Sequence, residues 1–314
     1  MRYRTLGQSG LVVSVVGLGC NNFGGRVDRV VTREVVDAAI DMGVTLFDTA
    51  DMYSLGASEE FLGEVLGGRR DQVVLATKFG HRRADMGYGP AAGAKGGRAY
   101  IRRAVEGSLR RLRTDYIDLY QLHVPDPATP IAETLTALDE LVREGKVRYI
   151  GCSNFAGWQI AEAAHVAERI GVAPFISAQN HWSLLERAAE AEVVPAARHY
   201  GLGVLPYFPL ASGLLTGKVR RGRPIPEGTR LAARADPIAE EKLDRVEALI
   251  AWAERRGRSL LEVAIGAQAA QPGCASVIAG ATSATQVKAN GEAAQWIPAD
   301  DELAEIDEIV PPLR

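Results

Sequence analysis

The residues most able to do chemistry in this sequence stand at the ends of short apolar segments. An apolar run over residues 44–47 ends in Asp48, a second run ends in Lys78 and a third ends in His123. Tyr53 follows Asp48 by five residues, just before a segment with helical spacing. A carboxylate, an ammonium, an imidazole and a phenol can together hold and transfer a proton. Because a buried charge is costly without a partner, we expect these side chains to share one site.

Each of these residues has a simpler interpretation when it is taken alone. An aspartate at a strand end is more often a turn former or a helix cap, and a single histidine is more often a packed core or surface residue. Three further segments also end in polar side chains, and their final residues are Ser153 and Asn154, Gln179 and Asn180, and Tyr207. Six polar ends that fall on one rim of a sheet favour a shared site.

Eight short apolar segments alternate with stretches of helical spacing, and this alternation predicts the fold. Strands that are apolar along their length and alternate with helices indicate a parallel sheet covered on both faces. Eight such units match a (β/α)8 TIM barrel, in which chemistry gathers at the carboxyl ends of the strands. The expected strands cover residues 13–20, 45–48, 73–78, 117–123, 147–154, 175–180, 203–208 and 276–281.

Two features depart from a minimal barrel. The opening segment, residues 3–19, is expected to form a β-hairpin across "GQSG" that caps the bottom of the barrel. Residues 80–98 and 212–235 are long segments rich in Gly, Pro and Arg that follow the third and seventh strands. Loops of this length often act as lids or binding loops. Since no change of composition marks a boundary, we expect a single barrel domain over residues 1–314.

The composition excludes several classes of protein. A net charge of −3 and a pI near 6.0 give no basic surface for nucleic acid. No apolar run reaches the ~18 residues of a membrane span, and the first residues lack the apolar stretch of a signal peptide. Cys20, Cys152 and Cys274 form neither a zinc pattern nor a disulfide framework, which suits a reducing compartment. We therefore expect a cytoplasmic protein without nucleic-acid or membrane partners.

Four separated segments resemble, in order, the aldo-keto reductase family in its bacterial and channel-β-subunit-like branch. They are "LFDTADMY" (46–53), "VVLATKFG" (73–80), "YIDLYQLH" (116–123) and "IGCSNF" (150–155). The resemblance continues over nearly the whole chain and implies a barrel that binds a nicotinamide dinucleotide without a Rossmann domain. In agreement, "GLGCNN" (17–22) has Asn22 where the Rossmann motif needs its third glycine.

The resemblance implies a catalytic tetrad of Asp48, Tyr53, Lys78 and His123. Tyr53 would give a proton to the carbonyl oxygen while hydride reaches its carbon. Lys78 would lower the pKa of this phenol, ordinarily about 10, by stabilising the phenolate. Asp48 would supply the anion that a buried lysine needs. His123 would donate a hydrogen bond to the carbonyl oxygen and stabilise its developing charge.

The resemblance also assigns positions along a bound cofactor. Tyr207 corresponds to the aromatic side chain that stacks on the nicotinamide. The segment "GATSATQVKAN" (280–290) matches the adenosine-phosphate site, and its helix amino terminus is a natural anion site. The remaining positions are Ser153, Asn154 and Gln179 at the carboxamide, Cys20, Asn21 and Asp48 at the ribose, Pro209, Leu210, Ser212, Gly213 and Lys218 at the pyrophosphate, and Gly280, Thr282, Gln286 and Asn290 at the adenosine phosphate.

Two departures from the family pattern concern the choice of cofactor. The family usually has a glutamate before the asparagine at 290, whereas this chain has Ala289, and residues 280–287 contain no Arg or Lys to meet a 2′-phosphate. We expect NADPH, with NADH as the alternative. The missing charge would come from the long segment after the seventh strand, which contains Arg220, Arg221, Arg223, Arg230 and Arg234.

The expected activity is reversible reduction of an aldehyde or ketone to the alcohol, and it does not require an oligomer. The partner is a small-molecule carbonyl compound. The side chains expected to wall the substrate pocket would favour an apolar or aromatic carbonyl, and they are Phe23, Met52, Phe79, Tyr88, Trp182 and Phe208.

Three other functions stay open at this point. A regulatory or sensor subunit would bind NAD(P)H with little turnover, but channel β-subunits of this family have an asparagine in the place of His123. An NAD-dependent alcohol or sugar dehydrogenase would run the same chemistry in the oxidative direction. A metal-dependent hydrolase would need a metal site, and the five histidines include no H-x-H pair, so we expect no metal.

Overall fold

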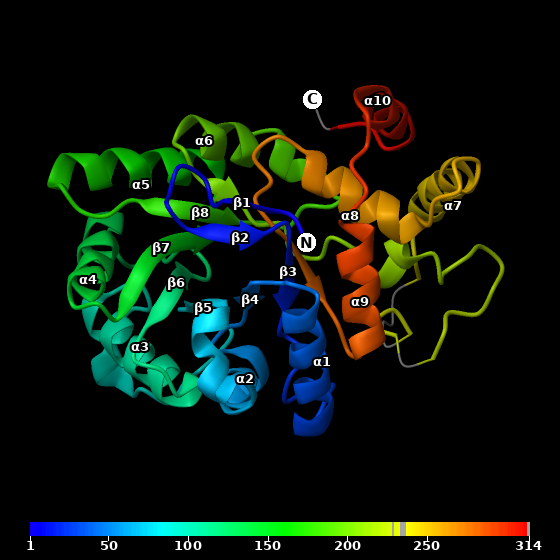
Figure 1. Ribbon diagram of the computed structural model, residues 1–314. Coiled ribbons are helices and arrows are strands. Elements are labelled where there is room, and N and C mark those ends of the chain that lie inside the picture. The colour runs from blue at the N-terminus through cyan, green and yellow to red at the C-terminus, as the bar shows by residue number, and fades with distance from the viewer. Residues whose placement is uncertain (228, 233–236, 313–314) are drawn as a thin grey trace.

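Eight parallel strands form the central sheet, and helices cover its outer face (Figure 1). The computed structural model describes residues 1–227, 229–232 and 237–312. Neighbouring strands follow the order β10-β3-β4-β5-β6-β7-β8-β9, which confirms the predicted TIM barrel. The strands are β3 (Val16–Gly19), β4 (Leu46–Asp48), β5 (Val74–Phe79), β6 (Ile117–Leu122), β7 (Val147–Ser153), β8 (Phe175–Gln179), β9 (Gly203–Val204) and β10 (Val277–Gly280).

The two edges of this sheet meet and close the barrel. Isolated parallel bridges pair Val204 with Cys274 and Tyr207 with Ile278. The backbone N–H of Ile278 donates to the carbonyl of Pro206 at 3.0 Å. Since Pro206 has no N–H to donate, the pairing is interrupted here, and β9 is shorter than the strand predicted at 203–208.

Helices follow most strands and pack apolar faces against the sheet. In α3, for example, buried Ile101, Val105 and Leu109 recur at helical spacing. The helices are α1 (Arg29–Asp41), α2 (Ala57–Leu66), α3 (Arg98–Leu112), α4 (Ile131–Arg143), α5 (Gly157–Ile170), α6 (Val193–His199), α7 (Glu240–Glu254), α8 (Leu260–Ala270), α9 (Ala284–Ala293) and α10 (Asp300–Ile309).

The predicted amino-terminal hairpin is present and caps the barrel. Strands β1 (Tyr3–Thr5) and β2 (Val12–Ser14) pair antiparallel, so the segment predicted as one strand from residue 13 is divided between the hairpin and β3. Fully buried Leu6 and Val13 join one apolar cluster with side chains from inside the barrel, which include Leu46, Ala76, Leu119 and Leu205. The hairpin therefore fills the end of the barrel opposite the carboxyl ends of the strands.

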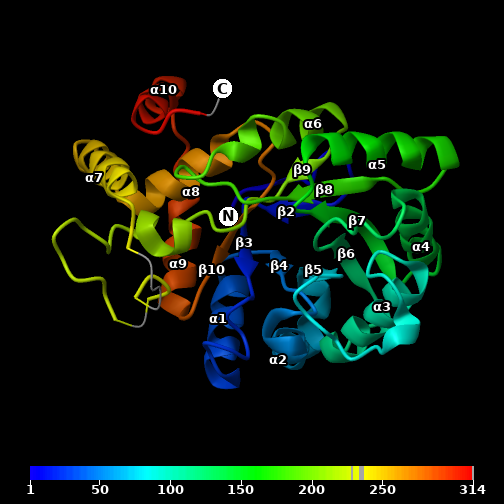
Figure 2. The same ribbon diagram turned by 180° about the vertical axis from the view of Figure 1, so that it is seen from behind.

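Two long connections lie at the carboxyl ends of the strands. The β5–α3 loop (residues 80–97) contains one short 3₁₀ helix, Pro90–Ala92. The β9–α7 loop (residues 205–239) contains another, Ala211–Thr216, and its described part extends outward beside α9 (Figure 2). These two loops bring residues that are far from the barrel strands in sequence to its open end.

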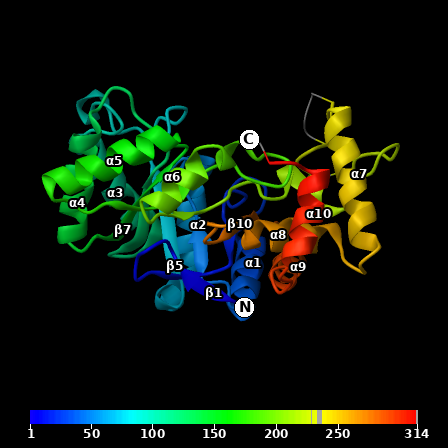
Figure 3. The same cartoon turned by 90° about the horizontal axis from the view of Figure 1, so that it is seen from above.

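The carboxyl-terminal helix α10 packs beside α7 at one side of the molecule (Figure 3). Arg187, which is buried, fixes this end by donating to the carboxylate of Asp307 and to the carbonyl of Val310, each at 2.6 Å. Among the described residues, no helix is both long enough and apolar enough to cross a membrane.

Candidate functional site

A cavity of about 1050 Å³ opens at the carboxyl ends of the strands. The last residues of several strands line it, among them Gly19, Asp48, Ser153 and Gln179. His123 lines it directly after β6. The rim on which the sequence predicted a shared site is therefore the wall of one cavity.

Lys78 lies beneath the floor of this cavity and is completely buried. Its ammonium Nζ donates to Asp48 Oδ2 at 2.7 Å, to the carbonyl oxygen of Thr49 at 2.8 Å and to the hydroxyl of Tyr53 at 3.3 Å. Three acceptors satisfy the three N–H groups of an ammonium. Burial, the largest single influence, lowers the pKa of Lys78, but Asp48 and Tyr53 together raise it above its ordinary value. Lys78 is therefore charged at neutral pH.

Two glutamine side chains fix the other oxygen of Asp48. Gln179 Nε2 donates to Asp48 Oδ1 at 2.9 Å, and Gln121 Nε2 donates to the same oxygen at 3.4 Å. The sequence prediction did not include Gln121. Its polar side chain within the otherwise apolar β6 was the signal that could have identified it, because a buried polar group needs a partner.

Tyr53 is held by an unusual turn between β4 and α2. Ser54 and Leu55 have left-handed backbone angles, with φ of 50° and 53°. Such conformations are uncommon outside glycine and often occur at functional sites. Ser58, at the start of α2, ties the end of this turn to the segment after β3, because its hydroxyl donates to the carbonyl of Cys20 at 2.8 Å. The phenol oxygen of Tyr53 is thereby held within reach of Lys78.

The protonation of Tyr53 differs from the sequence expectation. Burial raises the pKa of Tyr53, and the opposing effect of Lys78 is smaller. The expected net lowering is therefore not present in this structure, because desolvation of the phenol outweighs the effect of Lys78. Tyr53 carries its proton at neutral pH.

His123 lies beside Tyr53 at the top of β6. The two rings meet edge to face with centroids 5.9 Å apart. Burial lowers the pKa of His123 well below its usual value, and Lys78 and His81 lower it further. A neutral imidazole has one N–H donor, so His123 can donate to a group in the cavity without being charged.

Next to the hydrogen-bonded group of Asp48, Tyr53 and Lys78 lies a second one, formed by Tyr207, Asn154 and Ser153. The Tyr207 hydroxyl donates to Asn154 Oδ1 at 2.7 Å, and Asn154 Nδ2 donates to the carbonyl of His123 at 2.9 Å. Ser153 donates to the carbonyl of Gln179 at 2.9 Å. His181, which the prediction omitted, stacks on the Tyr207 ring with centroids 5.4 Å apart.

The far end of the cavity is built on the start of α9. Thr282 donates through its backbone N–H to Gln286 Oε1 at 2.9 Å, and Ser283 caps the helix by accepting from the backbone N–H of Gln286. Every residue named above for cofactor binding lines the cavity, namely Cys20, Asn21, Asp48, Ser153, Asn154, Gln179, Tyr207, Pro209, Leu210, Ser212, Gly213, Lys218, Gly280, Thr282, Gln286 and Asn290.

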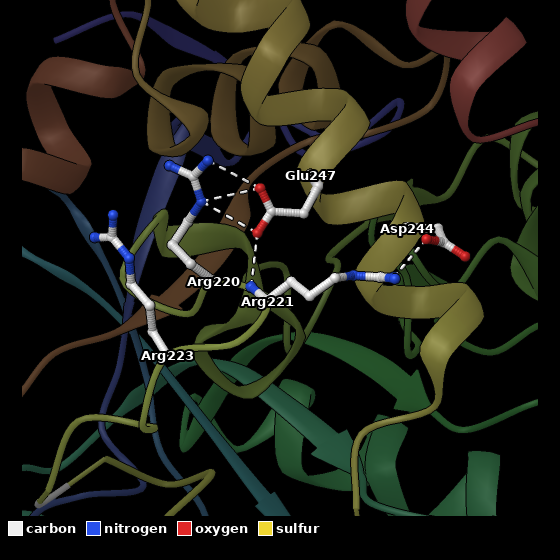
Figure 4. A pocket seen from close by; sticks show the side chains of 5 residues that line it. All are labelled: Arg220, Arg221, Arg223, Asp244 and Glu247. Atoms are coloured by element: carbon white, nitrogen blue, oxygen red, sulfur yellow. Dashed lines mark hydrogen bonds and ion pairs between the residues drawn. The ribbon is translucent and has the colours of Figure 1, made fainter.

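Two of the arginines in the β9–α7 loop pair with carboxylates of α7 rather than facing the cavity. Arg220 forms a close ion pair with Glu247 of α7, and Arg221 pairs with Asp244 and donates its backbone N–H to Glu247 (Figure 4). Arg223 points away from both carboxylates in the same view (Figure 4). Arg220 and Arg221 therefore fix this loop to α7.

Arg230 is the arginine of this loop that lines the cavity, among its described residues. It donates to the side-chain oxygens of Asn22 at 2.9 Å and Asn21 at 3.2 Å. Asn22 in turn donates to the carbonyl of Ala281 at 3.1 Å. The guanidinium thus lies close to residues 280–287, which have no positive charge of their own. Arg234 lies outside the described residues.

The predicted aromatic pocket is largely wrong. Met52 and Phe208 line the cavity, whereas Phe23, Phe79, Tyr88 and Trp182 are not among the described residues that line it. Phe23 is buried in the core, Phe79 stacks on Tyr120, Tyr88 packs against Tyr100, and Trp182 donates to Glu190. Basic side chains take their place at the cavity wall, namely Arg26, His81, Arg82 and Arg83.

Two buried carboxylates, Glu59 and Asp51, lie behind the Tyr53 turn. Glu59 is completely buried and accepts from Arg111 at 2.7 Å and from Thr77 at 2.6 Å. Asp51 is nearly as buried, and neither of its carboxylate oxygens has a side-chain donor among the described residues. Burial and the neighbouring Glu59 raise the pKa of Asp51 to about 7.

We expect Asp51→Asn to stabilise the protein at about pH 8, by about 1–3 kcal/mol. The folded state binds a proton at Asp51 more tightly than the unfolded state, so wild-type stability falls as pH rises from about 4 to 7. The advantage of the amide should vanish towards about pH 4, where both states hold the proton. Denaturant unfolding at both pH values measures this, with Asp41→Asn, an exposed residue at the end of α1, as the control. An equal effect at both pH values would contradict the prediction.

Comparison with known proteins identifies relatives of this chain along nearly its whole length. The sequence model described as "Aldo/keto reductase family" matches residues 15–311. The chain is 41% identical over 296 residues to "Uncharacterized oxidoreductase YrpG" of Bacillus subtilis (strain 168), covering 92% of this chain and 89% of that one. It is 36% identical over 321 residues to "Aldo-keto reductase YhdN" of the same organism (99% and 94%). It is 37% identical over 310 residues to "Probable voltage-gated potassium channel subunit beta" of Oryza sativa subsp. japonica (95% and 92%).

Proposed function

The chain belongs to the aldo/keto reductase family, and from this premise we propose that it reduces an aldehyde or ketone to the alcohol with NADPH, Tyr53 giving the proton. Membership makes it an NAD(P)H-dependent oxidoreductase of carbonyl compounds. The tetrad, the preference for NADPH and the direction of the reaction are our proposals. We also place the protein in the cytoplasm, where its three free cysteines are stable.

The observation that carries the proposal is the contact of buried Lys78 with both Asp48 and Tyr53. The phenol of Tyr53 holds its proton until negative charge develops on a carbonyl oxygen nearby. That oxygen then takes the proton, and the Lys78 ammonium at 3.3 Å stabilises the phenolate that is left. Asp48 keeps the ammonium in place throughout.

His123 would orient the substrate. Its neutral ring can donate a hydrogen bond to the carbonyl oxygen without placing another positive charge beside Lys78. Because the donor is fixed beside Tyr53, the same oxygen can contact both side chains. This arrangement aligns the carbonyl carbon for hydride attack and its oxygen for protonation.

The residues present fit a nicotinamide dinucleotide. The cavity is large, and it combines an aromatic ring at Tyr207, amide side chains at Asn154 and Gln179, and a helix start at α9. When bound, the nicotinamide supplies the hydride. Lys218 would meet the pyrophosphate and Arg230 the 2′-phosphate, since Arg230 lies beside the uncharged segment 280–287.

Arg230→Gln is expected to raise the Kd for NADPH by about tenfold or more while changing the Kd for NADH little. A hydrogen bond to a charged group contributes about 1.5–3 kcal/mol, and only NADPH has the 2′-phosphate. Quenching of tryptophan fluorescence measures both constants. Arg223→Gln, in the same loop but outside the cavity, is the control. Equal weakening of both cofactors would move Arg230 to the pyrophosphate and remove this basis for NADPH preference.

A regulatory subunit with little turnover is the second candidate, because relatives from rice and Arabidopsis thaliana are named as probable potassium-channel β-subunits. The neutral donor His123 beside Tyr53 favours turnover instead. Mixing the purified protein with NADPH and a panel of aldehydes, and following the loss of NADPH absorbance, separates the two. Turnover supports the reductase; tight NADPH binding with no turnover on any aldehyde supports the subunit.

A further inference from the structure

A tight turn at the start of the β5–α3 loop lies at the cavity wall. Gly80, with φ of 82°, turns the chain directly after β5. The backbone N–H of Ala84 donates to the carbonyl of His81 at 3.2 Å, and that of Arg83 donates to His81 Nδ1 at 3.2 Å. Lys95, from the far end of the loop, donates to the carbonyls of both His81 and Ala84. We call residues 81–84 the basic turn, and these contacts fix its conformation.

The basic turn lies next to the residues proposed for catalysis. The ring of His81 meets the ring of His123 edge to face, with centroids 4.7 Å apart. His81, Arg82 and Arg83 all line the same cavity as Tyr53. The basic turn therefore faces the part of the cavity in which a carbonyl group would contact Tyr53 and His123.

The two arginines of the basic turn have no acidic partner within the described part of the chain. Neither Arg82 nor Arg83 forms an ion pair with any described carboxylate, in contrast to Arg220 and Arg221 of the other long loop. Of the described carboxylates that line the cavity, Asp48 is held by Lys78, and Glu227 belongs to the β9–α7 loop. Both side chains are exposed and belong to residues that line the cavity, so they can meet an external anion.

We propose that the substrate is a carbonyl compound that also carries a carboxylate or phosphate group, and that Arg82 and Arg83 bind this group. The inference rests on the proposed function and specifies its substrate class. Guanidinium groups bind carboxylate and phosphate oxygens through paired, charge-assisted hydrogen bonds. Hydride and proton transfer to a carbonyl do not themselves need such a charge, so the basic turn selects among substrates.

The position of His81 limits the length of the substrate. His81 directly precedes the two arginines in the sequence and contacts the ring of His123, and its neutral ring can donate one hydrogen bond. Burial lowers the pKa of His81, and the nearby Arg83 lowers it further. We therefore expect a short chain between the carbonyl and the anionic group, because both arginines directly follow His81, whose ring contacts the ring of His123.

The test compares matched charged and uncharged aldehydes with NADPH. Succinic semialdehyde is paired with butyraldehyde, and glyceraldehyde phosphate with glyceraldehyde. We expect wild-type kcat/KM to favour the charged member of at least one pair by about tenfold or more, mainly through KM. Preference confined to the first pair identifies a carboxylate, and preference confined to the second identifies a phosphate.

The double variant Arg82→Gln/Arg83→Gln should remove this preference. The kcat/KM for the charged aldehyde should fall by about tenfold, less at high salt because exposed charges are screened. Reduction of the uncharged aldehyde should change little, and this also verifies that the variant is folded. The double variant Arg33→Gln/Arg169→Gln removes two exposed charges from α1 and α5 and should leave the preference intact.

Different failures are distinguishable in this experiment. If wild type reduces uncharged aldehydes with the same kcat/KM as charged ones, the proposed substrate class is wrong, while the proposed reductase activity stands. If the Arg82/Arg83 variant loses charged and uncharged substrates equally, the basic turn has a structural role and the inference is overturned. If NADPH binds but no aldehyde of either kind is reduced, the proposed function itself fails, and the inference fails with it.

Discussion

Tyr53→Phe is expected to lower kcat for carbonyl reduction by roughly 10²-fold or more, the usual effect of a positioned acid, with the Kd for NADPH nearly unchanged. The substitution removes the hydroxyl that gives the proton and keeps the ring. Lys78 keeps its two shorter hydrogen bonds, to Asp48 and to the carbonyl of Thr49. The loss should therefore fall on chemistry rather than on folding or cofactor binding.

A matched substitution separates this effect from the general loss of a phenol. Tyr200 lies near the surface, and its hydroxyl contacts His165. Tyr200→Phe should reduce carbonyl compounds at the wild-type rate. Wild-type turnover in the Tyr53 variant would remove Tyr53 from the mechanism, whatever the behaviour of the control.

Lys78→Met is expected to reduce turnover to a comparable extent and also to destabilise the fold. Without the ammonium, nothing stabilises the phenolate of Tyr53, and Asp48 becomes a buried carboxylate without its ion-pair partner. Removal of one member of a buried pair commonly costs about 3–5 kcal/mol. Turnover and thermal unfolding measure the two effects separately.

The double variant Asp48→Asn/Lys78→Met distinguishes chemistry from stability. It removes the unpaired charge and should recover part of the lost stability, since replacing both members of a buried pair is often close to neutral. Its turnover should stay as low as that of Lys78→Met. A folded Lys78→Met protein with wild-type rates would contradict the role of the ammonium, and activity recovered in the double variant would do the same.

The fold and the grouping of polar strand ends could be predicted because both follow from regular geometry. Parallel strands of a barrel place their carboxyl ends on one rim, and the observed register sets Asp48 beside Ala76 and Lys78 beside Gln121. Neighbouring strands thus bring Asp48 and Lys78 together although they are thirty positions apart in the sequence. Alternation of apolar and helical segments predicts the shared rim, whereas the pairing of Asp48 with Lys78 was implied by the resemblance to the family.

One error in the predicted substrate walls was avoidable from the sequence, whereas the placement of the basic turn could not be predicted from it. Successive side chains of a strand point to opposite faces, so Phe79 must point away from the side that Lys78 occupies, and it packs on Tyr120 instead. The basic turn depends on Lys95, which reaches back 14 residues to the carbonyl of His81. Contacts of this kind are set by loop conformation, which sequence periodicity does not describe.

The pKa of Tyr53 and the choice of arginine for the 2′-phosphate also could not be predicted from the sequence. The expected lowering of the Tyr53 pKa considered Lys78 but not the burial that outweighs it. Which of the five arginines could meet the 2′-phosphate likewise depends on the residues that each contacts. Arg220 is paired with Glu247, whereas Arg230 donates to Asn21 and Asn22 at the cavity. Burial and pairing follow from tertiary contacts, and these decide which charges reach a site.

Transfer of deuterium from the cofactor to the alcohol decides whether the protein is an NADPH-dependent carbonyl reductase. The purified protein is mixed with NADPH that carries deuterium at the transferable position and with succinic semialdehyde or butyraldehyde, and the alcohol is examined by mass spectrometry. We expect an alcohol with one deuterium on the former carbonyl carbon, formed at least roughly 10²-fold more slowly by Tyr53→Phe. An absence of labelled alcohol with every aldehyde, from a protein that binds NADPH, would contradict this expectation.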